Sequence, residues 1–245
     1  KYIDPNICEN NYSLLTYACE TNNVDIVKKL LTFENIDVNI YDIITGKTCL
    51  MVSIENDCVE IAEILINFPK TNINAEDNFG QSALALAVSK DAESIVNLLI
   101  NNERFNPKLS RFNYAFAISI GTITDILFKS KYININENML AFPTQRLPQN
   151  VVANKYKNQA LNIHNTIETP LICAVKNNNK KVVDLILQHP EFDKKKSKLY
   201  EAIFLTSKEN NLEMYRKLIK LIDDDSFCGC CSFTRISSVV EIGKK

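Results

Sequence analysis

The sequence NIHNTIETPLICAVKNNNKKVVDLILQHPEF, residues 162–192, carries the signals of one complete helical repeat unit. Thr169 followed by Pro170 is typical of a helix start, because threonine caps the first turn and proline lacks only an N–H that the helix does not use there. Apolar residues at helical spacing then form two short stripes, which the asparagine run 177–179 separates. Neither helix can bury its apolar face alone, so the unit predicts neighbours that stack on it.

Five further copies of this pattern occur along the chain. In the reference copy, Thr169 stands five residues before Ala174, and apolar residues stand three before and eight after it. The residues equivalent to Ala174, called the anchors here, are Ala18, Ser53, Ala87, Ala115, Ala174 and Thr206, and the spacings between them are 35, 34, 28, 59 and 32 residues. Six copies favour a repeat solenoid over the alternative, an unrelated all-helical bundle.

The chain resembles the ankyrin-repeat family, whose repeats of about 33 residues begin with T-P-L-H-x-A. Thr169-Pro170-Leu171 matches the first three letters, and residues 74–82 resemble the family's β-hairpin, or finger. The resemblance implies an all-α fold, an ankyrin-type solenoid of about six helix-turn-helix repeats with short β-hairpin fingers. The family's His, two residues before the anchor, is replaced in every copy, by Thr16, Met51, Ala85, Asn113, Ile172 and Phe204.

The turns between the paired helices depart from the family in a way that has a physical explanation. Four residues after each anchor, where the family has Gly, the chain has Asn22, Asp57, Asp91, Ser119, Asn178 and Asn210. After Gly, Asn and Asp best tolerate the left-handed conformation that ends a helix, so we expect it at five of these six turns. A compositional bias toward Asn is a second explanation, and we expect both to apply.

The repeats predict how the chain is organised. A solenoid over residues 1–222 contains repeats near 11–39, 46–74, 80–107, 108–135, 162–193 and 198–222. The 28-residue spacing indicates a deleted finger before the fourth repeat, and the long spacing indicates an inserted loop at about 136–160, either functional or disordered. Residues 223–245 form a tail outside the repeats. Because the sequence starts at Lys1 rather than Met, we expect a fragment or a processed product.

Composition and motifs give little support for catalysis. Among the 8 Cys, four stand at apolar repeat positions, which favours a reducing, intracellular (cytoplasmic) compartment: Cys19, Cys49, Cys58 and Cys173. The sequence has no run of about 20 apolar residues and no glycine-rich phosphate loop. The two His residues, His164 and His189, have no nucleophile and carboxylate arrangement around them. We therefore expect no enzymatic activity, no cofactor and no metal site.

The resemblance implies a non-catalytic protein–protein interaction scaffold or adaptor that binds a protein partner through the finger tips and the concave helix face. The alternatives are a structural component of a large assembly, for example a cytoskeletal one, and the substrate-recruiting part of a larger enzyme complex. Carried onto matching positions, the partner-binding residues are Glu20, Thr21, Ile43, Ile44, Lys47, Glu55, Asn56, Asn78, Phe79, Gln81, Ser89 and Lys90. Ile43, Ile44 and Phe79 are the strongest candidates, because apolar side chains on finger tips suit interface hot spots. The alternative for Phe79 is packing on the neighbouring finger.

The charge is unevenly distributed. Residues 1–122 hold 9 Lys and Arg against 16 Asp and Glu, whereas residues 123–245 hold 19 against 13, so the halves differ in sign although the net charge is −1. This predicts either an acidic partner surface for the C-terminal half or head-to-tail association of two copies. Nucleic acid is not expected as a partner, because no aromatic residues interleave with the lysine run at 194–198.

The tail is unusually apolar for a terminus and contains Cys228, Cys230 and Cys231. The cluster has three ligands at the wrong spacing for zinc. Two uses stay open. The tail could cover the outward apolar edge of the last repeat, which we favour, or its cysteines could be acylated. We expect membrane attachment only in the second case, since two acyl chains give stable anchoring where one does not.

Overall fold

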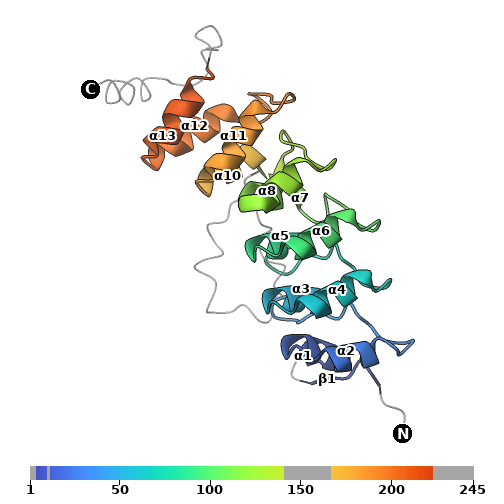
Figure 1. Cartoon of the computed structure of the whole chain (residues 1–245). Coiled ribbons are helices and arrows are strands. Elements are labelled where there is room, and N and C mark those ends of the chain that lie inside the picture. The colour runs from blue at the N-terminus through green and yellow to red at the C-terminus, as the bar shows by residue number, and fades with distance from the viewer. Residues whose placement is uncertain (1–3, 10–11, 141–166, 223–245) are drawn as a thin grey trace, which may run out of the picture.

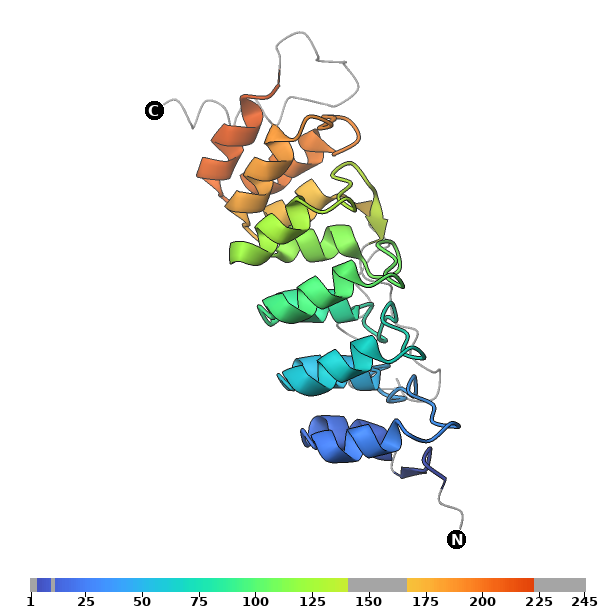
Figure 2. The same ribbon diagram turned by 45° about the vertical axis from the view of Figure 1, so that its right-hand side comes forward.

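The computed structural model describes residues 4–9, 12–140 and 167–222. Figures 1 and 2 show these residues as an elongated stack of helix pairs, which confirms the prediction of an all-α repeat solenoid. The first helices of the six pairs are α1 (Leu14–Glu20), α3 (Cys49–Glu55), α5 (Ala83–Ser89), α7 (Phe112–Ile118), α10 (Pro170–Lys176) and α12 (Leu199–Lys208). The second helices are α2 (Val24–Leu30), α4 (Val59–Asn67), α6 (Glu93–Asn101), α8 (Gly121–Phe128), α11 (Lys180–Gln188) and α13 (Leu212–Ile219).

Side-chain caps explain where four of the first helices begin. The hydroxyl groups of Ser13, Thr48, Ser82 and Thr169 each accept a hydrogen bond from the backbone N–H three residues further on. The fourth and sixth repeats begin differently, because Arg111 and Lys198 precede their first helices in the left-handed conformation, with φ of 50° and 55°. Both residues follow tight turns that replace a finger, and neither was predicted to be left-handed.

The turns inside the repeats agree with the sequence at five of six places. Residues with a positive φ close the first helix at Asn22, Asp57, Asp91, Asn178 and Asn210. Ser119 is extended instead, and the positive φ moves to Gly121. Gly121 is therefore the residue that supplies the left-handed turn in the fourth repeat.

One continuous apolar core runs through the stack, and all six anchors are buried in it. First helices of successive repeats pack against one another, including α7 against α10, although 51 residues separate the end of one from the start of the other. The residues between these two helices therefore do not interrupt the stacking of the fourth repeat on the fifth.

Four repeats begin with a finger. The first finger pairs β1 (Cys8–Glu9) with β2 (Tyr12–Ser13), and the fifth pairs β3 (Met139–Leu140) with β4 (Ile167–Glu168). The second and third fingers, residues 41–48 and 76–82, close through single bridges, Tyr41 to Thr48 and Glu76 to Ser82.

The fifth finger changes the boundary of the insertion. The inserted loop was expected to begin near residue 136, but residues 136–140 belong to the link and the first strand of this finger. The remainder of the expected loop falls within residues 141–166, which lie outside the described residues, as does the predicted resumption of the repeat at residue 162.

An asparagine ladder joins successive repeats on the finger side. Four asparagines share one geometry. The side-chain amide of each donates a hydrogen bond to a backbone carbonyl in the segment that leads into the next repeat, and its oxygen accepts a hydrogen bond from the backbone N–H two residues after that carbonyl. They are Asn6, Asn39, Asn74 and Asn136. Lys108 occupies the equivalent place in the fourth repeat. There the Asn113 side chain accepts the N–H of Asn134 at 3.1 Å instead.

Candidate protein interface

The second finger presents two apolar side chains at its tip. The Asp42 carboxylate accepts the N–H groups of Ile44 at 3.1 Å and Thr45 at 3.0 Å and the Thr45 hydroxyl at 2.6 Å. These bonds fix the turn, while the side chains of Ile43 and Ile44 stay about half exposed, at 48% and 52%. The tip is therefore rigid and apolar at once, which is a favourable combination for binding.

The third finger repeats this construction. The Oδ1 atom of Asp77 accepts the N–H groups of Phe79 and Gln81, both at 2.8 Å. Phe79 at the tip is 46% exposed. A large part of its ring thus faces solvent, while the rest is covered by the protein.

Asn78 joins these two tips into one surface. Its side-chain amide donates to the carbonyl oxygens of Ile43 at 3.3 Å and Ile44 at 3.0 Å, and its backbone N–H donates to Thr45 at 2.8 Å. The approach requires glycine opposite, because a Cβ on Gly46 would lie 2.5 Å from the Asn78 nitrogen. Asn78 therefore uses its side-chain amide and its backbone N–H to hold the third finger against the second.

The predicted helix-face residues lie in two groups. Near the fingers, Lys47 and Glu55 form an ion pair at 2.6 Å, in which only 16% of the Lys47 side chain is exposed. Gln81 lies at the base of the third finger. The rest are found where α1, α3 and α5 end: Glu20, Thr21, Asn56, Ser89 and Lys90.

Several residues of the second group use their polar atoms within the chain. Thr21, Asn56 and Ser89 each donate a side-chain hydrogen bond to a carbonyl in their own helix. Lys90 forms an ion pair with Asp57 at 3.4 Å. Glu20 is exposed. The most accessible apolar surface among the predicted residues is therefore at the finger tips.

Asp77 is a buried acid within the third finger. It is 6% exposed, and its Oδ2 atom has no hydrogen-bond partner among the described residues. Burial raises the pKa of this carboxyl, although the N–H groups of Gln81 and Phe79 oppose the shift. Ionising Asp77 in the folded chain therefore costs free energy, and this cost makes stability depend on pH.

A groove lies beside the second and third fingers, and sequence reasoning missed it. Its volume is about 1150 Å³, and its lining includes Tyr41, Ile43 and Leu109. Tyr41 and Leu109 are both exposed. Tyr41 was detectable, since it precedes the predicted finger, but Leu109 reaches the groove only because the fourth repeat has no finger.

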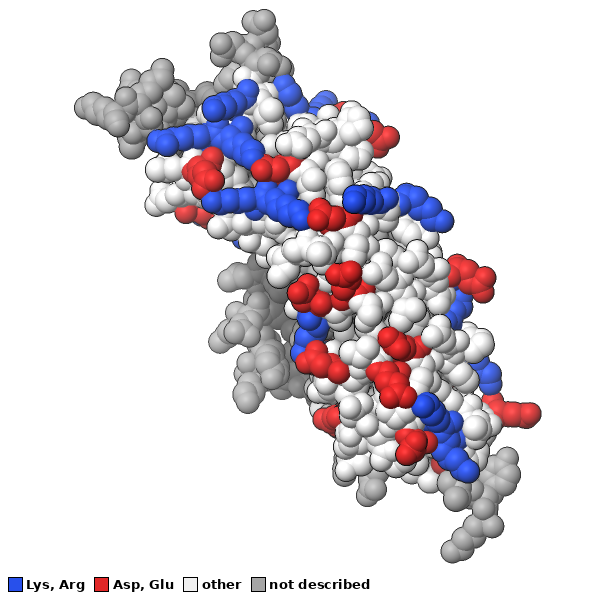
Figure 3. Space-filling view, viewed as in Figure 1, with Lys and Arg blue, Asp and Glu red and all other residues white. Residues whose placement is uncertain are grey.

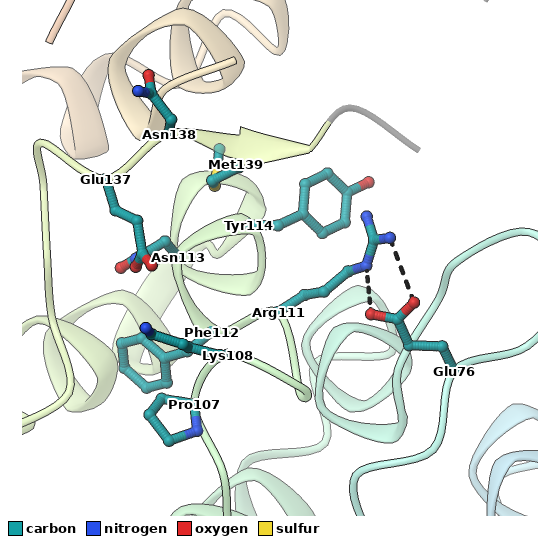
Figure 4. A pocket seen from close by; sticks show the side chains of 10 residues that line it. All are labelled: Glu76, Pro107, Lys108, Arg111, Phe112, Asn113, Tyr114, Glu137, Asn138 and Met139. Carbon is teal, nitrogen blue, oxygen red and sulfur yellow. Dashed lines mark hydrogen bonds and ion pairs between the residues drawn. The ribbon is translucent and has the colours of Figure 1, made fainter. Parts of the chain in front are cut away.

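A smaller pocket of about 210 Å³ lies at the start of the fourth repeat, which has no finger, and its lining runs from Glu76 of the third finger to Met139 of the fifth. Figure 4 shows the side chains that line it. The Arg111 guanidinium donates from Nε to Glu76 Oε1 at 2.7 Å and from Nη2 to Oε2 at 3.3 Å. Asn113 donates to the Glu137 carboxylate at 2.6 Å. Burial raises the pKa of the neighbouring Tyr114 phenol to about 12. Only the short repeat spacing hinted at this pocket.

Charged side chains cover the face of the second helices. Figure 3 shows basic side chains gathered over the end of the stack that carries α11 and α13, while acidic side chains predominate nearer its middle. Ion pairs cross between neighbouring repeats, as Lys28 with Glu60 and Lys181 with Asp125, both at 2.9 Å. Charge on this face thus contributes to stacking as well as to the surface.

The remaining predicted groups add no reactive site to the described part. The thiols of Cys8, Cys19, Cys49, Cys58 and Cys173 are free, and burial raises the pKa of Cys173 to about 12. His189 packs edge-on against the Phe128 ring. Within residues 4–9, 12–140 and 167–222, no cluster of His, Cys, Asp and Glu could hold a metal, and no helix is long and apolar enough to cross a membrane. His164 and the three tail cysteines, Cys228, Cys230 and Cys231, lie outside these residues, so acylation stays a prediction.

Stacked helix pairs with hairpin fingers on one edge define a repeat solenoid. Family models match two parts of the chain: three copies of the ankyrin repeat over residues 15–111, and one ankyrin repeat over residues 168–195. Together these matches cover about half of the sequence. The chain belongs to the ankyrin-repeat family, whose repeats generally mediate protein–protein interactions and are typically non-catalytic. No curated protein matches it.

Proposed function

We propose that this chain is a non-catalytic scaffold or adaptor that binds a protein partner across its second and third fingers. The observation that carries the proposal is the position of Ile43, Ile44 and Phe79. All three are about half exposed, and they stand on two finger tips that Asn78 ties together. Exposed apolar side chains on a rigid support are the kind of residue that dominates binding energy.

The fingers pay little entropy on binding, because their turns are already ordered by hydrogen bonds to Asp42 and Asp77. Tyr41 and Leu109 extend the apolar surface into the adjacent groove. The partner that fits this surface carries apolar side chains in an exposed loop or helix, which the tips and the groove together can enclose. Lys47 and Glu55 provide charge at its edge.

The test is a variant in which Ile43, Ile44 and Phe79 are all changed to serine. We expect helical content to stay the same, since these side chains are outside the core, and partner capture by the purified chain to fall at least tenfold, which corresponds to about 1.4 kcal/mol. Ile120→Ser is the matched control, because Ile120 is 60% exposed but lies at the turn between α7 and α8. Equal capture by the triple variant and the control would refute the proposed surface.

The chain's place in a reducing, cytoplasmic compartment is part of the same proposal. Four apolar-position cysteines, Cys19, Cys49, Cys58 and Cys173, are buried and free, which supports it. The role of a structural component in a large assembly shares the same surface. The exposed apolar residues on the first and last described repeats, Leu14 and Phe204, also support that structural role.

A further inference from the structure

The outer face of the last repeat carries an apolar residue at a position built for stacking. The residue two before the anchor contacts the following repeat in the first repeat, where the Thr16 hydroxyl lies 3.4 Å from the Cys49 thiol, and in the fourth, where Asn113 bonds Asn134 and Glu137. Five repeats bury this residue: Thr16, Met51, Ala85, Asn113 and Ile172. In the sixth repeat it is Phe204, which is 57% exposed. A terminal repeat that ended the stack in solvent would carry a polar residue there.

The outer face of the first repeat shows the complementary feature. Leu14, four residues before the anchor, is 42% exposed, whereas four of its five equivalents, Cys49, Ala83, Pro170 and Ala202, are buried and the fifth, Arg111, is partly buried. Ile26, eight residues after the anchor, is 39% exposed, whereas its equivalents are buried in every later repeat: Ile61, Ile95, Ile123, Val182 and Met214. Both apolar residues are uncovered because no repeat precedes this one in the described stack.

The charges on the two outer faces match a pairing that occurs at two of the five junctions inside the described stack. At these junctions a residue ten positions after one anchor pairs with a residue seven positions after the next anchor: Lys28 with Glu60, and Asp125 with Lys181. At the last junction the ion pairs use neighbouring positions, Lys180 with Glu213 and Asp184 with Lys217. On the outer faces of the last and first described repeats, the positions ten and seven residues after the anchor hold Arg216 and Asp25, respectively. Both side chains are exposed, they have opposite signs, and neither forms an ion pair with another described residue.

We infer that copies of this chain associate head to tail, with the first repeat of one copy stacked on the sixth repeat of the next. Phe204 of one copy packs on Leu14 and Ile26 of the other, and Arg216 pairs with Asp25. The contact continues the geometry by which each repeat stacks on its neighbour. It goes beyond the proposed function and uses surfaces separate from the finger tips.

This interface is heterologous, since the two copies contribute different faces. Such a contact leaves one free face of each kind and therefore builds an open chain of copies rather than a closed dimer. The opposite net charges of the two halves of the sequence favour this arrangement over a symmetric one. The average size of the assembly should then grow with protein concentration.

Sedimentation or light scattering of the full chain across a wide concentration range tests the inference. We expect the average mass of the wild-type chain to rise with concentration. Phe204→Ser, Asp25→Arg and Arg216→Asp should each weaken association about tenfold, the scale of one lost hot-spot contact. Leu212→Ser is the control, because Leu212 is also exposed on the last repeat but at a position that is exposed in several repeats.

Mixing two variants gives the decisive result. Asp25→Arg alone and Arg216→Asp alone each place like charges at the contact, whereas their mixture restores opposite charges at every contact of an alternating chain. We expect the mixture to associate as the wild type does. A wild-type chain that stays monomeric would overturn the inference and leave the end faces to the tail or to another protein. So would association that is indifferent to Phe204→Ser, or a mixture that is not rescued. All these variants keep the finger tips, so partner capture distinguishes this failure from failure of the proposed function.

Discussion

Asn74 accepts the backbone N–H of Asn106 on its side-chain oxygen at 2.8 Å, although the two residues belong to different repeats. The same side chain donates to the carbonyl of Arg104 at 2.7 Å and accepts the Ser110 hydroxyl at 2.7 Å. One side chain thus holds the complete link that leads into the fourth repeat, where the finger is missing.

Asn74→Ala should lower the free energy of unfolding by about 2 kcal/mol, because it removes three hydrogen bonds and leaves their partners to find water. Urea unfolding followed by circular dichroism measures the change. Asn67→Ala is the control, since Asn67 is exposed at the end of α4. A similar stability for the two variants would show that the ladder contributes nothing.

The turn at Asp91 offers a test of the left-handed positions. Its φ is 55°, a conformation that costs a residue with a Cβ roughly 1–2 kcal/mol, less for Asp and nothing for Gly. Asp91→Gly should therefore leave stability unchanged or higher, whereas Asp91→Ala should reduce it by about 1 kcal/mol. Thermal unfolding of the two variants compares them directly, and a more stable alanine variant would contradict the explanation.

The buried carboxyl of Asp77 makes stability depend on pH. Burial raises its folded pKa above the unfolded value, so the folded state binds the proton more tightly, and stability is lost as pH rises through the folded pKa. Asp77→Asn keeps an oxygen for the N–H groups of Phe79 and Gln81 and removes the charge. We expect this variant to be more stable than wild type at neutral pH.

The advantage of Asp77→Asn should disappear below the ordinary aspartate pKa, where the wild-type carboxyl is also neutral. Urea unfolding at several pH values measures the difference. Asp77→Ala, which loses both hydrogen bonds, should be less stable than the asparagine variant at every pH. A constant difference between wild type and Asp77→Asn across pH would argue against the raised pKa.

The ion pair between Arg111 and Glu76 should be stronger than those on the outer face. Arg111 has 11% of its side chain exposed and reaches Glu76 through two nitrogens, whereas Lys28 and Glu60 are 56% and 60% exposed. A double-mutant cycle with Arg111→Met and Glu76→Gln should give a coupling energy above about 1 kcal/mol. The cycle with Lys28→Met and Glu60→Gln should give less than about 0.5 kcal/mol. Equal coupling in both cycles would contradict this ranking.

Sequence patterns predicted the helix pairs, the cap at Thr169 and five of the left-handed turns, because these features depend on residues within one or two turns of each other. Arg111 and Lys198 escaped prediction, since neither residue type favours a positive φ. Their conformation follows from the tight turns that replace two fingers.

The candidate interface was predictable in part, because finger tips stand at a fixed place in each repeat. Other features depend on contacts between repeats. Asn78 bonds to the neighbouring finger, Leu109 lines the groove, and Arg111 lines both the groove and the smaller pocket. Most of these contacts leave no pattern in the local sequence. The asparagine ladder does leave a pattern, an Asp or Asn two residues before each of Asn6, Asn39, Asn74 and Asn136. That this pattern marks hydrogen bonds between repeats is visible only when the repeats are stacked.

The pairing of Leu140 with Ile167 has a practical consequence for engineering. These two residues lie on adjacent strands, and the helices on either side of them, α7 and α10, stack directly. Because this strand pairing and helix stacking already hold positions 140 and 167 close together, the free energy of folding should depend little on the length of the connection between them. A fluorescent reporter or an affinity tag grafted between positions 140 and 167 should leave the solenoid folded, and would turn this chain into a traceable carrier for cargo.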